Sequence, residues 1–322
     1  VSADTPPLLC VMGPTAAGKT DLAVALAERL GGELISVDSA LVYRGLDIGA
    51  AKPNYPHHLI DIRDPAVPYS AAEFVADARR AIATIVSRGK QPILVGGTML
   101  YFRSLLLGLD EIPAADPLVR ARIAKKAAAQ GWPAMHAALA EVDPAIAATI
   151  HPNHSQRISR ALEVWQQTGK PMSEWQQGLA DQPILPHLPL VVCPKERRWL
   201  HERIALRLDQ MFDQGFLDEV RRLRERPGMH PGLPSLRAVA YRQLWSYFEG
   251  EYDLETARLR AQAATRQLAK RQLTWLRNWP AAVWLDTDPS FRRYKGRCRS
   301  WCCSFGMFVD TWIDYKIFRA YI

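Results

Sequence analysis

A glycine-rich segment near the N-terminus constrains the fold of this chain more than any other feature. The segment consists of Gly13, Pro14, Thr15, Ala16, Ala17, Gly18, Lys19 and Thr20. It fits the pattern G-x-x-x-x-G-K-[ST] in full, and it lies between an apolar run at 8–12 and a stretch with helical spacing at 20–30. Backbone N–H groups of such a loop surround phosphate oxygens, and the helix dipole adds to the attraction. The pattern therefore predicts a P-loop between a strand and a helix.

The motif predicts phosphate binding without identifying the phosphate compound. Lys19 supplies a positive charge to the distal phosphates, and the Thr20 hydroxyl can ligate Mg²⁺. A second apolar run at 34–37 ends at Asp38, and a phosphoryl-transfer enzyme needs an acidic residue to hold its metal. At this point, therefore, an ATP-binding kinase for a nucleotide or other small molecule is an open alternative.

The pattern of apolar residues alternates between strands and helices in the first hundred residues. After the P-loop come predicted strands at 34–37 and 92–95, with a predicted helix at 71–87 between them. Strands that alternate with helices favour a parallel sheet covered by helices on its faces. The expected fold class is α/β, a P-loop NTPase-like parallel sheet flanked by helices.

The pattern changes after residue 108. Two Ala-rich stretches at 117–141 and 144–167 have helical spacing and no strand between them, which indicates an inserted all-helical domain. Core elements resume with a strand at 188–192, helices at 197–224 and 254–276, and a strand at 282–285. We expect a P-loop core at 1–110 and 186–289, the helical insertion at 111–185, and a tail without clear periodicity at 290–322.

The net charge of +8 indicates a polyanionic partner. The excess is concentrated late in the chain, where residues 256–300 contain eleven Lys or Arg residues and only two acidic ones, Asp286 and Asp288. No apolar run approaches the roughly 20 residues of a membrane-spanning helix, and the opening residues do not resemble a secretory signal. We therefore expect a cytoplasmic protein that makes no membrane contact, with a monomer as the default.

Five cysteines in 322 residues do not indicate a disulfide framework. Cys10 and Cys193 lie in apolar runs, where buried thiols are the plain interpretation. Cys298, Cys302 and Cys303 cluster in the tail, but a zinc site there would need a fourth ligand, and no His follows His230.

Eight segments, in order along residues 8–286, carry a more specific pattern. They are the P-loop at 13–20, SVDSALVY at 36–43 with DIGAAKP at 47–53, LIDIRDP at 59–65, GGTMLY at 96–101, QRISRALEV at 156–164, TGKP at 168–171, RAVAYRQ at 237–243 and TRQLAKRQ at 265–272. Together they resemble the tRNA dimethylallyltransferase (isopentenyltransferase) family of the bacterial type. Ala50 replaces the usual Thr, Ala240 replaces a usual Gly, and the stretch at 53–57 is shorter than is typical.

The resemblance implies transfer of a dimethylallyl group from dimethylallyl diphosphate to N6 of adenosine 37, next to the tRNA anticodon, with release of diphosphate and with Mg²⁺ as cofactor. It assigns Asp38 as the base for the adenosine amine, whereas a kinase would use it to hold Mg²⁺. The resemblance assigns Thr98 as a second hydrogen-bonding partner at the acceptor site, and a residue that only caps the end of a strand is the alternative. The resemblance assigns Arg207 as a further cation that binds the diphosphate, and a place on a solvated helix face is the alternative.

The resemblance also implies contact with the tRNA anticodon stem-loop. The implied residues are Asp38, Ser39, Ala40, Leu41, Thr98, Arg120, Gln156, Arg157, Ile158, Ser159, Arg160, Arg237, Ala238, Val239, Ala240, Tyr241, Arg242, Lys270, Arg271, Gln272, Leu273, Thr274, Trp275, Leu276 and Arg277.

Helical periodicity supports the last of these segments independently. At 100° per residue, Arg266, Lys270 and Arg277 fall within about 40° of one another, and Leu268 and Trp275 lie opposite them. This predicts a basic helix face for phosphate contact, backed by an apolar face. A kinase leaves the basic helix unexplained, and a non-enzymatic RNA-binding protein leaves Asp38 and Thr98 without a role.

Overall fold

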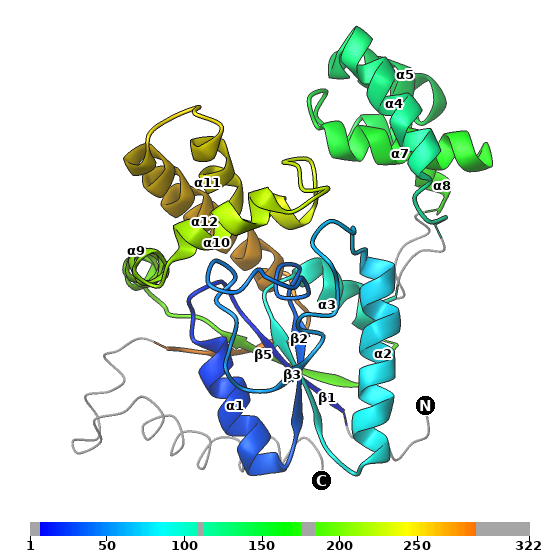
Figure 1. Cartoon of the computed structure of the whole chain (residues 1–322). Coiled ribbons are helices and arrows are strands. Elements are labelled where there is room, and N and C mark those ends of the chain that lie inside the picture. The colour runs from blue at the N-terminus through cyan, green and yellow to red at the C-terminus, as the bar shows by residue number, and fades with distance from the viewer. Residues whose placement is uncertain (1–6, 109–111, 176–183, 288–322) are drawn as a thin grey trace. The chain divides into compact units, whose positions relative to one another are not determined.

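The computed structural model describes residues 7–108, 112–175 and 184–287. This part of the chain forms two compact units, shown in Figure 1. The described residues of Val1–Leu106 and Leu185–Ile322 form the first unit, and those of Leu107–Ile184 form the second. The expected tail at 290–322, with its three cysteines, lies outside the described residues.

The first unit is built on one parallel sheet, whose strands in the described region follow the order β3-β2-β4-β1-β5-β6. The strands are β1 (Leu8–Met12), β2 (Glu33–Val37), β3 (His57–His58), β4 (Pro92–Gly96), β5 (His187–Val192) and β6 (Val283–Leu285). The helices are α1 (Lys19–Leu30), α2 (Ala71–Ser87), α3 (Met99–Leu106), α9 (Arg197–Asp213), α10 (Phe216–Glu225), α11 (Tyr241–Phe248) and α12 (Leu254–Arg277), with a 3₁₀ turn, η1, at Ser235–Arg237.

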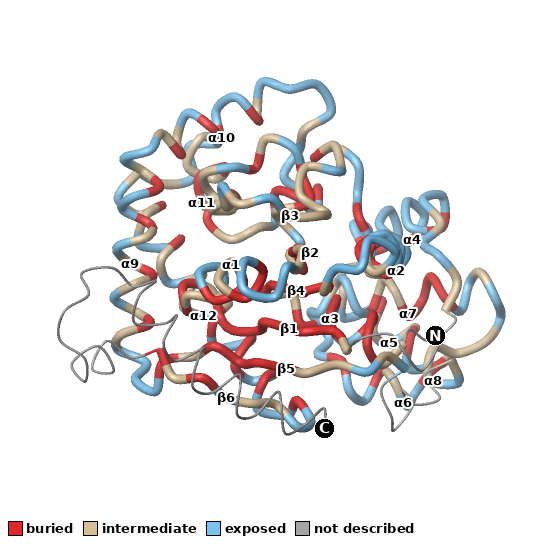
Figure 2. Tube along the Cα trace, turned by 90° about the horizontal axis from the view of Figure 1, so that it is seen from below, coloured by how far each residue is buried: buried red, intermediate tan, exposed pale blue. Residues whose placement is uncertain are grey.

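Both faces of the sheet are buried under helices. Successive side chains of a strand point to opposite faces, and in β1 Cys10 and Met12 pack against α2 and α3, whereas Leu9 and Val11 pack against α1 and α9. Figure 1 shows α1 and α2 on opposite sides of the strands, and Figure 2 shows the buried residues concentrated along β1 and β4. The predicted fold class, a parallel sheet flanked by helices, is confirmed.

The predicted helix at 197–224 is wrong in one respect, because the structure divides it into α9 and α10. Gly215 separates them with φ at 93°, a left-handed conformation that glycine adopts without steric cost. The break redirects the chain, so that Phe216, Val220 and Leu223 of α10 enter the core cluster that also holds Tyr241.

The second unit contains only helices in its described residues. They are α4 (Pro117–Gln130), α5 (Trp132–Val142), α6 (Pro144–Ala147), α7 (Ser155–Thr168) and α8 (Met172–Trp175). The predicted helix at 117–141 is divided at Gly131, which has φ at 80° and precedes Trp132-Pro133. Val119 and Ile123 of α4 pack with Leu139 of α5 and Ile158 of α7 in a small core of their own.

Among the described residues, no helix combines the length and the apolar character that a membrane span requires.

Candidate active site

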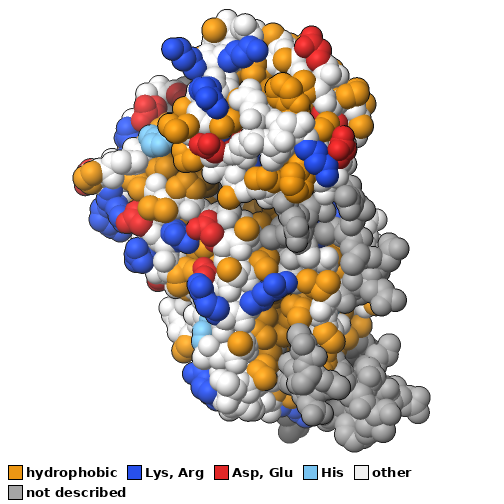
Figure 3. Space-filling model, turned by 90° about the vertical axis from the view of Figure 1, so that its right-hand side faces the viewer, with side chains coloured by type: hydrophobic (Ala, Val, Ile, Leu, Met, Phe, Trp, Pro, Cys, Tyr) orange, Lys and Arg blue, Asp and Glu red, His pale blue; other side chains and the backbone are white. Residues whose placement is uncertain are grey.

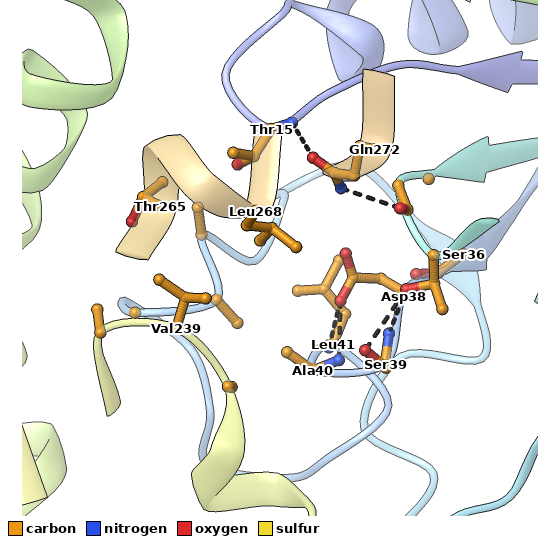
Figure 4. A pocket seen from close by; sticks show the side chains of 18 of the residues that line it. Thr15, Ser36, Asp38, Ser39, Ala40, Leu41, Val239, Thr265, Leu268 and Gln272 are labelled. Carbon is orange, nitrogen blue, oxygen red and sulfur yellow. Dashed lines mark hydrogen bonds between the residues drawn. The ribbon is translucent and has the colours of Figure 1, made fainter. Parts of the chain in front are cut away.

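A cavity of about 570 Å³ lies at the carboxyl ends of the central strands of the first unit. The cavity is lined by Lys19 at the end of the P-loop, by Asp38 directly after β2, and by Thr98 shortly after β4. Arg207 of α9 also lines the cavity. So does one side of α12, where Figure 4 shows Leu268 and Gln272. Open parallel sheets bind ligands at this edge, because the loops that follow neighbouring strands converge there.

The P-loop forms the phosphate side of the cavity. Gly13 lies so close to β5 that an added Cβ would be 2.3 Å from the carbonyl oxygen of Val192. Gly18 has φ at 95° and precedes α1, whose N-terminus carries the partial positive charge of the helix. Thr20 is exposed and lines the cavity, with its hydroxyl at the start of that helix.

Lys19 is the central cation of the loop. Its Nζ donates a hydrogen bond to the carbonyl oxygen of Pro14 at 2.7 Å. Burial and the nearby Arg207 lower the pKa of Lys19 to about 8, and the carboxylate of Asp38 partly offsets them. A bound anion would favour the protonated form. The lysine therefore occupies an environment suited to a negative ligand.

Arg207 contributes a second positive charge to the same cavity. Its side chain is half-buried, and burial lowers its pKa, with Asp38 acting in the opposite direction and Arg203 in the same direction. A guanidinium remains protonated in proteins even so. Lys19 and Arg207 therefore supply two cations against the single carboxylate of Asp38.

Asp38 follows β2, and its carboxylate points into the cavity (Figure 4). Oδ1 accepts hydrogen bonds from the backbone N–H groups of Ala40 at 2.8 Å and Leu41 at 3.3 Å. No described residue donates to Oδ2. One oxygen is thus fixed by the turn that follows the strand, and the other is available to a ligand.

Thr98 follows β4 and joins the ends of two neighbouring strands. Its Oγ1 accepts a hydrogen bond from the backbone N–H of Ser39 at 3.1 Å, and its own N–H donates to the carbonyl oxygen of Val37 at 3.2 Å. The residue therefore caps the strand end that carries Asp38, and it also lines the cavity.

The tRNA-contacting residues that the sequence predicts differ in exposure. In the first unit, Ser39, Arg237, Arg242, Lys270, Arg271, Thr274, Trp275 and Arg277 are exposed. Six of the predicted residues are buried, namely Ile158, Ala240, Tyr241, Gln272, Leu273 and Leu276, and of these Ala240, Tyr241 and Gln272 border the cavity. Arg237, Arg271 and Trp275 line the cavity, so the first unit places several of the exposed predictions around it.

In the second unit, Arg120 and Arg160 share one acidic partner. Both lie 3.2 Å from a carboxylate oxygen of Glu163, which is fully buried and also accepts a hydrogen bond from the backbone of Asp116. Gln156 and Arg157 are exposed at the start of α7. Figure 3 shows one face of the molecule, where Lys and Arg side chains are scattered among acidic and hydrophobic ones. The described atoms of that face form no continuous basic patch.

The predicted apolar face of α12, with Leu268 and Trp275, borders the cavity and is not the face that packs on the core. Leu268 and Trp275 line the cavity, whereas Ala269, Leu273 and Leu276 face the core. Trp275 is 38% exposed, and the guanidinium of Arg103 lies 5.8 Å from its ring centroid. The helix lies at the edge of a cavity, so an apolar residue on it has two places to point, and periodicity alone does not distinguish them.

No sequence pattern indicates the buried pair of Glu219 and Tyr241. The Tyr241 hydroxyl donates to Glu219 at 2.5 Å and accepts from the backbone N–H of Ala50 at 3.1 Å. Glu219 also accepts from the backbone N–H groups of the loop at 47–49. Burial and the adjacent carboxylate raise the pKa of Tyr241, which keeps its hydroxyl protonated. A glutamate in an amphipathic helix has no local pattern that marks it as buried.

Comparison with known proteins identifies the family. Residues 41–279 match the family model described as IPP transferase. The chain is 58% identical over 279 residues to the tRNA dimethylallyltransferase of Alkalilimnicola ehrlichii, a match that covers 85% of this chain and 88% of that protein. It is 53% identical over 303 residues to tRNA dimethylallyltransferase 2 of Hahella chejuensis, covering 88% of this chain and 91% of that one.

Solved structures agree with these matches. The full-length tRNA isopentenylpyrophosphate transferase of Bacillus halodurans superposes with a TM-score of 0.65 at 35% identity, covering 98% of this chain and 99% of that one. A eukaryotic dimethylallyltransferase described as acting on tRNA gives a TM-score of 0.74 at 27% identity, covering 88% and 74%. The resemblance carried by the eight sequence segments is confirmed: the chain belongs to the IPP transferase family, with the tRNA dimethylallyltransferases that it matches along most of their length.

Proposed function

We propose that this protein transfers the dimethylallyl group of dimethylallyl diphosphate to N6 of adenosine 37 in tRNA. One observation carries the proposal: a single cavity combines two cations, Lys19 and Arg207, with the free carboxylate oxygen of Asp38. The names of the relatives supply the reaction and the tRNA substrate.

In the proposed reaction, a bond forms between N6 of the adenosine and the allylic carbon, and the bond between that carbon and the diphosphate oxygen breaks. Lys19 and Arg207 stabilise the negative charge that grows on the leaving diphosphate. Oδ2 of Asp38 accepts the proton that N6 loses, while Oδ1 stays bonded to the backbone of Ala40. The products are the substituted adenosine and diphosphate.

Mg²⁺ is the cofactor that we propose, and the residues present fit it. The described residues contain no group of three or more His, Cys, Asp or Glu side chains that would hold a metal by themselves. Mg²⁺ commonly binds through few protein ligands together with substrate phosphates and water. The exposed Thr20 hydroxyl would be the protein ligand, and the ion would neutralise charge on the diphosphate.

The apolar part of the cavity favours the isoprenoid over a kinase substrate. Leu208 and Met211 of α9 and Leu268 of α12 line the same space as the P-loop. A hydrocarbon tail would gain from contact with these side chains, whereas a ribose has hydroxyl groups that they cannot pair. We therefore favour prenyl transfer over phosphoryl transfer.

For tRNA we propose that the exposed residues near the cavity make the contacts and that the buried ones support them. Arg237, Arg242, Lys270 and Arg271 supply charges for backbone phosphates. The helical unit contributes Arg120, Gln156, Arg157, Ser159 and Arg160. An adenosine must leave its base stack to reach Asp38. We propose that the reaction takes place in the cytoplasm and that the protein is a monomer.

The test is incubation of the purified protein with undermodified tRNA, Mg²⁺ and either dimethylallyl diphosphate or ATP, followed by mass analysis of the nucleosides. We expect an adenosine heavier by one dimethylallyl group, formed only with the isoprenoid. ATP turnover on a small acceptor, without a prenylated nucleoside, would contradict the proposal and support the kinase.

A further inference from the structure

Gln272 of α12 is a buried polar residue whose position suggests a role other than RNA contact. Its side chain is 8% exposed, and both ends of its amide are bonded. Oε1 accepts from the backbone N–H of Thr15 in the P-loop at 2.9 Å, and Nε2 donates to the carbonyl oxygen of Gly97 after β4 at 2.9 Å (Figure 4). One side chain therefore links two loops that are more than eighty residues apart in the sequence.

The chemistry of the link requires an amide. Thr15 offers a donor and Gly97 offers an acceptor, so only one orientation of the Gln272 amide satisfies both. A carboxylate would accept from Thr15 but would repel the carbonyl oxygen of Gly97. Gly97 is suited to the contact because an added Cβ would lie 2.3 Å from Nε2 of Gln272.

The link extends from the phosphate side of the cavity to the carboxylate side. Thr15 belongs to the same loop as Lys19. Gly97 precedes Thr98, whose Oγ1 accepts from the backbone N–H of Ser39, the residue after Asp38. A continuous path of backbone and hydrogen bonds thus joins the loop that would hold the diphosphate to the strand end that carries the proposed base.

A residue that only stabilises the fold could also make hydrogen bonds to two buried backbone groups. Which loops the bonds join therefore decides between a stabilising and a positioning role. Reaction between two bound groups depends on their separation, and a displacement of about 1 Å can cost about a hundredfold in rate. One of the two loops joined by Gln272 carries Lys19, which is proposed to act on the diphosphate. The other is bonded through Thr98 to Ser39, the residue after the proposed base Asp38. Slippage between them would change the distance from the allylic carbon to the adenosine amine without removing any residue that contacts either substrate.

We propose that Gln272 is a positioning residue that holds the P-loop and the end of β4 at the spacing that transfer requires. The proposal rests on the proposed function. It replaces the direct RNA contact that the family resemblance implied for this residue. Because both bonds are made to backbone groups, the effect of Gln272 passes through loop geometry and not through its own contact with tRNA or diphosphate.

The experiment compares Gln272→Met, which has similar length and neither bond, with Gln272→Glu, which keeps only the bond to Thr15. Gln267→Met is the matched control, because Gln267 is exposed on the same helix and the substitution leaves the charge of the helix unchanged. For each full-length protein, the single-turnover rate of prenyl transfer is measured with saturating substrates. Dissociation constants for undermodified tRNA and for inorganic diphosphate with Mg²⁺ are measured separately, and thermal melting establishes that each variant is folded at the assay temperature.

We expect the transfer rate of both Gln272 variants to fall by roughly 10- to 100-fold, with both dissociation constants within about threefold of the parent values. The control should match the parent. A normal rate in both variants, or a loss confined to tRNA affinity, overturns the positioning role. If one variant does not fold, the other decides. If the parent protein transfers no prenyl group, the proposed function fails and this proposal fails with it, whereas an active parent isolates the outcome for Gln272.

Discussion

The phosphate side and the carboxylate side of the cavity are built in different ways. The phosphate side takes most of its groups from eight consecutive residues, whose glycines and helix start define the loop locally. The carboxylate side takes Asp38 from the end of β2, Thr98 from the end of β4, and its bracing amide from Gln272 on α12. The first is therefore determined mainly by local sequence, and the second by the packing of distant elements. Substitutions on the two sides should differ in which step they impair.

Replacement of Asp38 by Asn should give the largest effect. Asn retains an oxygen for the backbone N–H groups of Ala40 and Leu41, so the turn is kept, but the amide cannot accept the N6 proton. Loss of a general base typically costs about 10²- to 10⁴-fold in rate. We expect a single-turnover rate reduced by this range, with tRNA affinity nearly unchanged. A rate within tenfold of the parent would mean that the proton leaves by another route.

Replacement of Arg207 by Gln should have a smaller effect on the rate and should also weaken diphosphate binding. Removal of one group that stabilises developing negative charge typically costs about 10²- to 10³-fold. Inorganic diphosphate affinity, measured by calorimetry with Mg²⁺, should fall, while tRNA affinity stays the same. Arg198→Gln is the control, because Arg198 lies on the same helix with its side chain 87% exposed. Equal effects of the two substitutions would place Arg207 outside the diphosphate site.

The same division explains what could be predicted from the sequence. The P-loop, the parallel sheet and the helical insertion follow from contiguous motifs and from the period of apolar residues, which local chain geometry determines. Asp38 is a candidate from its place after a strand, which suits a kinase equally well. Its role as the base, like the role of Thr98, follows only from the resemblance. The bonds of Gln272, and those of Glu219 to the loop at 47–49, join residues that are 170 or more positions apart, and no periodicity carries that information.

Tyr241 tests how far the carboxylate side depends on distant packing. Tyr241→Phe removes the hydroxyl that donates to Glu219 and accepts from Ala50, so two buried polar groups lose a partner. Such a loss costs about 1–3 kcal/mol of the free energy of unfolding. Urea denaturation should show the decrease. Tyr247→Phe on the same helix is the control, because Tyr247 is only half-buried. A change below about 0.5 kcal/mol for Tyr241→Phe would show that the loop at 47–50 is held by other contacts.

Ala240 should give the smallest effect, although its backbone is unusual. It has φ at 74° and ψ at −44°, and it stands where the family usually has glycine. Backbone in this sparsely populated region, near the conformation of a γ-turn, costs an L-residue on the order of 1–3 kcal/mol, which Ala240→Gly would remove. The substitution would also remove a buried methyl group, worth about 0.8 kcal/mol, and would give the unfolded chain extra freedom worth about 0.4–1 kcal/mol. These contributions nearly cancel, so we expect the free energy of unfolding, measured by urea denaturation, to change by less than about 1 kcal/mol. A larger stabilisation would mean that the backbone strain at the start of α11 exceeds what burial of the methyl group and the freedom of the unfolded chain offset, so that packing holds this segment of the cavity wall in a strained conformation.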